Sequence, residues 1–364
     1  MNKRGVVFNG KFLTSGLTGV HRVAEELIKH LDTLLEENPG LRDREWTMLA
    51  PENAKRTLAL RHITIRKQGM LRWQFWEQFE LPWLVRGRLL VNLCNLAPLT
   101  CRGTITMIHD AQTFISPKSY SFLFQTWYQF ALPRIGKAAA RILTVSNYSR
   151  EQLIRFGVAA AGKIQVLHNG IDHLGFAAGQ AAALPAGLAP HSYALALSNT
   201  QEHKNIAILF KAFARPELAE FKLVLVGAGT HDDFKSKGIV APDNVVFAGR
   251  VSDAELSALY KDAICFAFPS TTEGFGLPPL EAMYLGCPAV VAPCGALPEV
   301  CGDAAIYVAA DDAPGWAKAI LDLRMPAARA ALVEKGLRHA SQFTWAKCAR
   351  KLLDIILEVA DRQK

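Results

Sequence analysis

Residues 264–283 read ICFAFPSTTEGFGLPPLEAM. An apolar run at 264–268 ends at Pro269, a glycine-containing loop follows, and Pro278 and Pro279 open a helical pattern. Proline suits the first turn of a helix, because the backbone N–H groups there have no helical partner anyway. A continuous apolar run before such a loop is typical of a strand in a parallel sheet that is covered on both faces. The segment therefore predicts a strand–loop–helix unit.

The same order of elements recurs along the chain. Apolar runs predict further strands at 6–8, 104–108, 142–145, 164–167, 193–197, 223–226, 245–247 and 289–292. Helical patterns lie at 20–36, 204–214, 253–261, 278–286 and 344–360. Alternating strands and helices predict an α/β chain with two Rossmann-like domains, whose parallel sheets face a central cleft. We expect domains at 1–172 and 192–344, with a linker at 173–191 that is rich in Ala, Gly and Pro.

Composition supports a folded chain of two domains. The chain has 364 residues, of which 50% are apolar and 20% charged, and its mean hydropathy is +0.12. No apolar run approaches the roughly 18 residues that span a bilayer, and Asn9 and Gly10 end the first short one, so no export signal is expected. The seven cysteines are an odd number without a C-x-x-C pair, which favours a reduced, cytoplasmic protein.

The positive charge is concentrated in the first domain. Residues 1–172 hold 23 Lys and Arg against 13 Asp and Glu, a net charge of +10, and the remainder has 18 against 20. The segment 55–88 combines eight Lys and Arg with aromatic side chains. This mixture indicates either a peripheral membrane contact, through Arg72, Trp73, Trp76 and Trp83, or an amphipathic helix with an aromatic core face. The residues leave both readings open.

The loop before Pro278 has the chemistry of a ligand site. Gly274 and Gly276 allow a ligand to approach the backbone and leave N–H groups at a positive helix end, which suits an anionic, hydroxyl-rich ligand. Glu273 in the loop and Glu281 in the helix could hold different parts of one extended ligand. Taken singly, Glu273 could instead stabilise the helix dipole and Glu281 could be a solvated helix residue. The combination favours a binding site.

This segment resembles the Glu-x7-Glu signature of family 4 of the retaining nucleotide-sugar glycosyltransferases, which have the GT-B fold. Other segments are similar to motifs of the same family in the same order: 16–20 (GLTGV), 109–110 (HD), 145–149 (VSNYS), 168–172 (HNGID) and 343–345 (FTW). The last of these resembles the start of the family's C-terminal helix, which implies that 345–364 crosses back to the N-terminal domain. The resemblance covers almost the whole chain.

The resemblance implies roles for individual residues. Glu273 would bind hydroxyls of the donor sugar, Glu281 the ribose hydroxyls, and Lys204 the diphosphate, whose growing charge an ammonium group stabilises. The further donor-binding residues that it implies are Gly16, Gly19, Asn199, Val251, Gly274, Phe275, Gly276 and Leu277. His109 is expected near the C6 hydroxyl of the sugar, with Asp110 orienting it or facing the acceptor. His109, Asp110 and Glu273 form the expected catalytic set.

One departure from the family's pattern concerns charge. Many relatives carry Arg where this chain has Asn199, and some carry Arg where it has His203, so the leaving group could depend on another base such as Arg22. No covalent intermediate is expected, because family members are thought to react on one face of the sugar. No cofactor or metal is expected either, since helix dipoles and basic side chains neutralise the diphosphate in this fold.

The resemblance therefore implies a retaining hexosyltransferase of bacterial polysaccharide biosynthesis. The segment 16–20 resembles mannosyl- and rhamnosyltransferases, so mannose from GDP-mannose is the first donor expected, and rhamnose or glucose from a dTDP- or UDP-sugar the alternative. The acceptor would be a glycan or a lipid-linked oligosaccharide, reached in the cytoplasm at the inner face of the membrane. A sugar-nucleotide epimerase of the same fold is a further alternative. A basic nucleic-acid- or membrane-binding protein is the non-enzymatic one, although no nucleic-acid-binding signature occurs.

Overall fold

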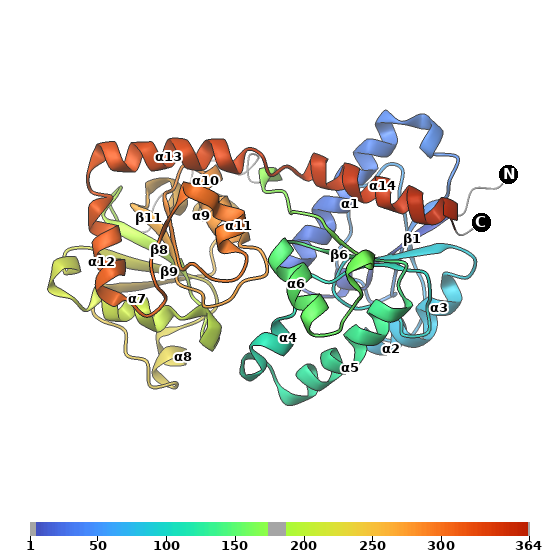
Figure 1. Cartoon of the computed structure of the whole chain (residues 1–364), viewed down its shortest axis with the longest axis horizontal. Coiled ribbons are helices and arrows are strands. Elements are labelled where there is room, and N and C mark those ends of the chain that lie inside the picture. The colour runs from blue at the N-terminus through green and yellow to red at the C-terminus, as the bar shows by residue number, and fades with distance from the viewer. Residues whose placement is uncertain (1–4, 174–186, 363–364) are drawn as a thin grey trace. The chain divides into compact units, whose positions relative to one another are not determined.

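A computed structural model describes residues 5–173 and 187–362 of the chain (Figure 1). The chain divides into two compact units, the first formed by residues 1–170 with 344–364 and the second by 171–343. Most of the expected linker, residues 174–186, lies outside the described residues.

The first unit is built on a parallel sheet. Its seven strands lie in the order β3-β2-β1-β4-β5-β6-β7. Their bounds are Val6–Asn9 (β1), Trp46–Ala50 (β2), Thr64–Lys67 (β3), Leu89–Asn92 (β4), Ile105–Met107 (β5), Arg141–Thr144 (β6) and Ile164–Val166 (β7). The sequence did not predict β2, β3 or β4. The edge strand β3 is largely exposed and therefore lacks an apolar pattern, whereas β4 follows directly on the basic, aromatic segment.

Helices cover this sheet, and the C-terminal helix is one of them. They are α1 (Gly19–Glu37), α2 (Trp73–Phe75), α3 (Leu81–Leu84), α4 (Gln112–Ile115), α5 (Phe122–Ala138), α6 (Asn147–Arg155) and α14 (Trp345–Arg362). The helix α14 lies beside α1 (Figure 1), and its buried face includes Leu352 and Ile356. Ion pairs from Arg44 to Asp361 (3.0 Å) and from Arg141 to Glu358 (2.6 Å) also join α14 to the unit.

The second unit repeats the architecture with six parallel strands in the order β10-β9-β8-β11-β12-β13. The strands are Tyr193–Leu197 (β8), Lys222–Val226 (β9), Val245–Gly249 (β10), Cys265–Phe268 (β11), Ala289–Val291 (β12) and Ala305–Tyr307 (β13). The helices are α7 (Ile206–Phe213), α8 (His231–Lys235), α9 (Asp253–Asp262), α10 (Leu277–Tyr284), α11 (Leu297–Cys301), α12 (Ala313–Asp322) and α13 (Pro326–Ala340). The predicted strands of this unit are confirmed, and β13 was missed.

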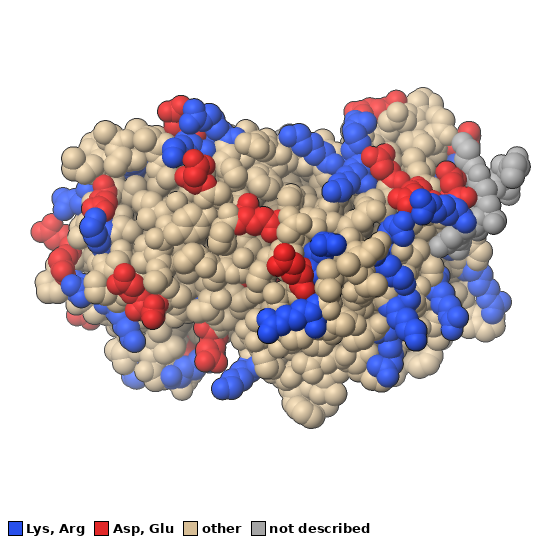
Figure 2. Space-filling model, viewed as in Figure 1, with Lys and Arg blue, Asp and Glu red and all other residues tan. Residues whose placement is uncertain are grey.

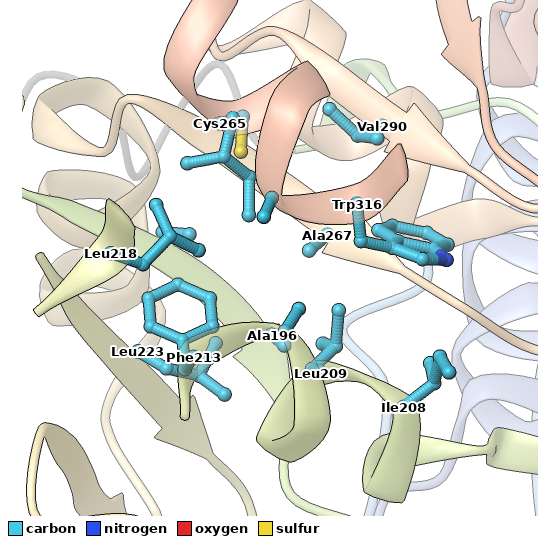
Figure 3. Close-up of a cluster of buried hydrophobic side chains, with 14 of the residues drawn as sticks. Ala196, Ile208, Leu209, Phe213, Leu218, Leu223, Cys265, Ala267, Val290 and Trp316 are labelled. Atoms are coloured by element: carbon cyan, nitrogen blue, oxygen red, sulfur yellow. The ribbon is translucent and has the colours of Figure 1, made fainter. Parts of the chain in front are cut away.

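The core of the second unit lies between helices and sheet. Leu209 and Phe213 of α7 and Trp316 of α12 face strand side chains such as Ala196 and Ala267 (Figure 3). All five are almost completely buried. Small residues on the strands leave room for the large side chains of the helices, which gives the interdigitated packing of protein interiors.

In both units the strand order reverses next to the first strand. From β1 the chain proceeds outward to β2 and β3 and then returns to β4 on the other side; from β8 it proceeds to β9 and β10 and returns to β11. Loops that leave the carboxyl ends of two such neighbouring strands diverge, and ligands of open α/β sheets bind in the crevice between them. Each unit therefore has one preferred position for a ligand.

In the view of Figure 2, Lys and Arg outnumber Asp and Glu over the first unit.

Candidate active site

The switch point of the second unit brings together two residues that the sequence predicts to bind the donor. Lys204 lies in the short helix Glu202–Lys204 after β8, and Glu273 lies in the loop after β11. The Lys204 Nζ is 2.7 Å from Glu273 Oε1, and their side chains are 23% and 14% exposed. The ammonium also lies 5.6 Å from the centroid of the Phe268 ring. A cation and an acid thus meet at the site predicted for phosphate and sugar.

Hydrogen bonds fix these two loops against each other. The Thr271 N–H donates to the His203 carbonyl over 2.8 Å. The Asn205 side-chain amide donates to the carbonyls of Pro269 (3.1 Å) and Ala310 (2.7 Å). Asn205 has φ +54°, a left-handed conformation that asparagine tolerates better than most residues, and it separates Lys204 from α7. The lysine is therefore positioned by a rigid turn.

Two glycines are required by close approaches around Glu273. Gly276 has φ +113°, and a Cβ there would lie 2.5 Å from a methyl carbon of Leu297. Gly295, with φ +56°, follows β12, and a Cβ there would lie 2.4 Å from the Glu273 carbonyl oxygen. The Glu273 carbonyl accepts a hydrogen bond from the Ala296 N–H (3.0 Å). The sequence predicted a functional Gly276 and missed Gly295, although a Pro–Cys–Gly turn after a predicted strand could have indicated it.

The helix α10 carries the second acid of the signature. Glu281 is 16% exposed, and its Oε1 lies 3.9 Å from the Nε2 of His173, so the two form an ion pair when the imidazole is protonated. Leu277 is the first residue of this helix and is half-buried. Phe275 is 5% exposed and packs edge-on against Phe343, with the ring centroids 6.1 Å apart. The side chain of Phe275 is thus part of the core.

Asn199 and His203, where relatives carry Arg, do not add a second positive charge beside Lys204. Asn199 closes a turn in which its Oδ1 accepts from the Gln201 N–H over 2.8 Å. Burial and the nearby Lys204 ammonium lower the pKa of His203, against a smaller opposing effect of Glu273, so His203 is neutral at physiological pH. Val251 is half-buried in the loop after β10, two strands away from β8.

The other predicted residues lie in the first unit. Gly16 and Gly19 are exposed before and at the start of α1, and a Cβ at either position would have no other atom within 4 Å, so packing does not require glycine there. His109 is buried, and its Nε2 donates to the Leu93 carbonyl over 2.9 Å. Burial lowers the pKa of His109 to about 4, which makes it a neutral group. Asp110 accepts from the Gln112 N–H (3.0 Å) at the start of α4.

The basic, aromatic segment divides between core and surface. Trp76 is completely buried against Val7 and Leu81, and its indole N–H donates to the Gln68 carbonyl over 2.7 Å. The prediction that Trp76 contacts a membrane is therefore wrong. Trp73 and Trp83 are 70% and 66% exposed. Arg72 is exposed too, so these three remain available at the surface.

Two properties of residues 5–173 and 187–362 bear on metals and membranes. In these ranges no group of three or more His, Cys, Asp or Glu side chains is placed to hold a metal ion. The same ranges contain no helix that combines the length and the apolar composition needed to cross a bilayer.

Comparison with known proteins places the chain in a family. Residues 192–325 match the family described as Glycosyl transferases group 1, and residues 42–173 match Glycosyltransferase Family 4. The O-antigen chain mannosyltransferase B of Escherichia coli is 30% identical over 269 residues, which are 71% of each chain. The O-antigen chain mannosyltransferase RfbU of Salmonella typhimurium is 29% identical over 240 residues, and the chain spans 65% of that relative's length.

Solved structures with low sequence identity share the fold. Sucrose-phosphate synthase from Thermosynechococcus elongatus has a TM-score of 0.74 at 19% identity, covering 98% of this chain and 99% of the other. Anabaena HepE, in complex with UDP and glucose, has a TM-score of 0.69 at 18% identity, covering 97% and 99%. Because both parts of the chain match and the Escherichia coli relative is 30% identical over most of its length, the chain belongs to glycosyltransferase family 4 and has the GT-B fold.

Proposed function

We propose that the protein is a retaining glycosyltransferase of bacterial polysaccharide biosynthesis, which moves a hexose from a nucleotide-diphosphate sugar to a glycan or a lipid-linked oligosaccharide. One observation carries the proposal: the Lys204 ammonium and the Glu273 carboxylate lie 2.7 Å apart at the switch point of a parallel sheet. A diphosphate sugar offers both groups a better partner, the phosphates for the cation and the sugar hydroxyls for the acid.

The chemistry then consists of positioning and electrostatics. The bond between the sugar C1 and the diphosphate oxygen breaks, and Lys204 stabilises the charge that develops on that oxygen. The acceptor hydroxyl oxygen bonds to C1 on the same face, and its proton passes to the leaving diphosphate. Glu273 and Glu281 hold the sugar and the ribose so that the two reacting oxygens stay close together. Retention of the anomeric configuration follows from attack on the face that the diphosphate leaves.

Mannose from GDP-mannose is the first donor we propose. The Escherichia coli and Salmonella relatives, both O-antigen chain mannosyltransferases by name, support this choice. The Anabaena HepE structure contains UDP and glucose, so a UDP- or dTDP-sugar is the alternative donor.

Nucleotide binding tests the proposal most directly. In a thermal-shift titration with GDP, UDP, dTDP and ADP, we expect one nucleotide to stabilise the protein, by about 2.7 kcal/mol at a hundredfold excess over its dissociation constant. Lys204→Ala and Glu281→Ala should remove the shift, and Lys261→Ala, a lysine at the far end of α9, should keep it. Absence of a shift with all four nucleotides would contradict the proposal. With the matching sugar donor and an acceptor, NMR of the product's anomeric proton then tests retention.

A peripheral membrane contact belongs to the same proposal. Phe75, Phe79 and Trp83 are 63–66% exposed on the segment from α2 to α3, and the Arg86 guanidinium lies 3.5 Å from the centroid of the Trp83 ring. Aromatic rings with adjacent arginines suit the headgroup region of an anionic bilayer. In co-sedimentation with vesicles of phosphatidylglycerol and phosphatidylethanolamine, a Phe79→Ser, Trp83→Ser variant should bind less than wild type. Leu337→Ser, at a position in α13 that is 43% exposed, removes a surface apolar side chain outside this segment; it is the control and should bind normally.

A further inference from the structure

The switch point of the first unit contains a cavity of about 280 Å³. It lies where the loops after β1 and β4 diverge, and residues of α1, α2 and α5 complete its wall. Polar and aromatic residues that line it include Asn9, Lys11, His21, Trp73, Glu77 and Tyr128. The volume is near the lower limit of about 300 Å³ for ligand pockets, so the cavity suits one small ring and not a long chain.

A buried ion pair forms one side of this cavity. The Glu77 side chain is 1% exposed, and its Oε2 lies 2.5 Å from the Lys11 Nζ. The other carboxylate oxygen accepts from the Asn9 amide over 2.8 Å, and Lys11 also donates to the Gln74 Oε1 over 2.8 Å. Burying two charges is unfavourable unless further hydrogen bonds hold them, as these do. The result is a preorganised donor, Lys11, and a preorganised acceptor, Glu77, on the cavity wall. Within the described part of the chain, the third hydrogen of the Lys11 ammonium has no acceptor.

The remaining titratable groups of the wall are uncharged. Burial is the main cause that lowers the pKa of His21, with Arg56 and Lys11 adding to it, and burial raises the pKa of Cys94 to about 12. Burial and the Glu77 charge raise the pKa of Tyr128 above its ordinary value. Arg56, which lies near His21, is paired with Glu25. Because Lys11 and Glu77 compensate each other, the wall has no net charge, and a neutral ligand fits it better than an anion.

Hydrogen-bonding capacity points to a ligand with hydroxyl groups. The His21 Nδ1 lies 2.8 Å from the Gly16 carbonyl oxygen, which can only accept, so Nδ1 holds the proton and Nε2 is an acceptor. The wall therefore offers donors from Lys11 and acceptors from His21 and Glu77. A hydroxyl group, which both donates and accepts, can use either kind, whereas a phosphate oxygen can use the donors alone.

Trp73 supplies an apolar surface at the rim. It has φ +53°, an uncommon conformation for a bulky residue, and it precedes a π-helical turn at Trp76–Glu80 that contains Glu77. Left-handed backbone is unfavourable for a residue with a bulky side chain and is retained where the surrounding structure requires it, often at functional sites, as are π-turns. The indole is 70% exposed and lines the cavity at the same time. An exposed ring beside polar groups is able to stack on the C–H face of a sugar.

We propose that this cavity binds one uncharged hexose ring of the acceptor, stacked on Trp73 and hydrogen-bonded to Lys11, Glu77 and His21. The inference rests on the proposed function and extends it, because it assigns the acceptor subsite to particular residues and its ligand to neutral sugars. An acidic sugar or a phosphate group of the acceptor would have to lie outside the cavity.

NMR titration with simple glycosides tests this. The probes are the methyl α-glycosides of mannose, glucose and galactose, and methyl α-glucuronoside as the anionic counterpart of glucose. We expect saturation transfer from the wild-type protein to at least one neutral glycoside and none to the glucuronoside. Trp73→Ala should raise the dissociation constant of the neutral glycoside about tenfold, which equals ~1.4 kcal/mol and lies within the range of an aromatic stacking contact. Trp83→Ala, which removes an exposed tryptophan outside the lining, should change nothing.

The controls separate this inference from the proposed function. Gln74→Ala, an exposed change at the cavity, removes a hydrogen-bond partner that positions the Lys11 ammonium, so it should also weaken glycoside binding. The test therefore does not depend on a variant of buried Glu77. Lys204→Ala should keep glycoside binding, and Trp73→Ala should keep the nucleotide thermal shift. No transfer to any neutral glycoside, equal transfer to the glucuronoside, or loss in Lys204→Ala instead of Trp73→Ala would overturn the assignment. A protein that binds the glycoside through Trp73 but binds no nucleotide would retain the sugar site and refute the transferase.

Discussion

The ion pair between Lys204 and Glu273 predicts that removing the acid strengthens the binding of a bare nucleoside diphosphate. In the unliganded protein the ammonium is compensated by Glu273 at 2.7 Å, and a diphosphate must replace that partner. Glu273→Gln removes the competing charge and keeps the shape of the side chain. We therefore expect tighter diphosphate binding together with weaker discrimination for the attached sugar, because the sugar hydroxyls lose a charged acceptor.

The magnitude follows from distance and burial. At 2.7 Å and an effective dielectric constant of about 20, the gross attraction is roughly 6 kcal/mol, most of which desolvation of the two groups offsets. The side chains are 23% and 14% exposed, between the surface and the buried cases, so the net contribution is about 1–2 kcal/mol. Glu273→Gln should lower the free energy of unfolding by that amount and tighten the diphosphate by up to about tenfold.

Isothermal titration of the nucleoside diphosphate and of its sugar conjugate measures both effects. The matched control is Glu202→Gln, which removes an exposed acid two residues before Lys204 and should leave both affinities unchanged. An unchanged diphosphate affinity in Glu273→Gln, or the same gain in Glu202→Gln, would show that Glu273 does not compete with the diphosphate for Lys204.

Three further predictions concern buried residues within one or the other unit. Burial lowers the pKa of His109 to about 4, against about 6.5 in the unfolded chain, so the stability that the neutral imidazole contributes is complete above pH 6.5 and is lost as the pH falls toward 4. The free energy of unfolding, measured with urea, should therefore fall by up to about 3 kcal/mol across that range, and His109→Gln should reduce this pH dependence. A Cβ at Gly170 would lie 2.2 Å from the Trp345 backbone nitrogen, so Gly170→Ala should cost about 1–3 kcal/mol in the same assay, whereas Gly162→Ala, with open space around it, should be near neutral. Trp316→Ala should destabilise the second unit by about 3–5 kcal/mol, and a loss below 1 kcal/mol would mean that its core repacks; Leu337→Ala, 43% exposed, serves as the comparison.

The local sequence was sufficient for the class of fold and for most of the loop between β11 and α10. Apolar runs that end at Gly or Pro predicted parallel strands, since a strand buried on both faces needs a continuous apolar run. The segment from Glu273 to Glu281 predicted a loop and a helix start, because glycine and proline restrict the backbone wherever they occur. These signals depend on residues close together in the chain. The exposed strand β3 was missed for the same reason, since its sequence carries no apolar pattern.

Tertiary structure decided which side chains meet. Lys204 and Glu273 are 69 residues apart and form a pair because β8 and β11 are neighbours in the sheet, a consequence of strand order that no local pattern contains. Trp76 and Trp83 have the same chemistry, yet one is core and the other surface, because a π-turn places Trp76 against β1 and β4. The neutral cavity beside Trp73 arises in the same way, since Asn9, Lys11 and Glu77 acquire their roles only when the carboxyl ends of two strands converge with a helix from elsewhere in the chain.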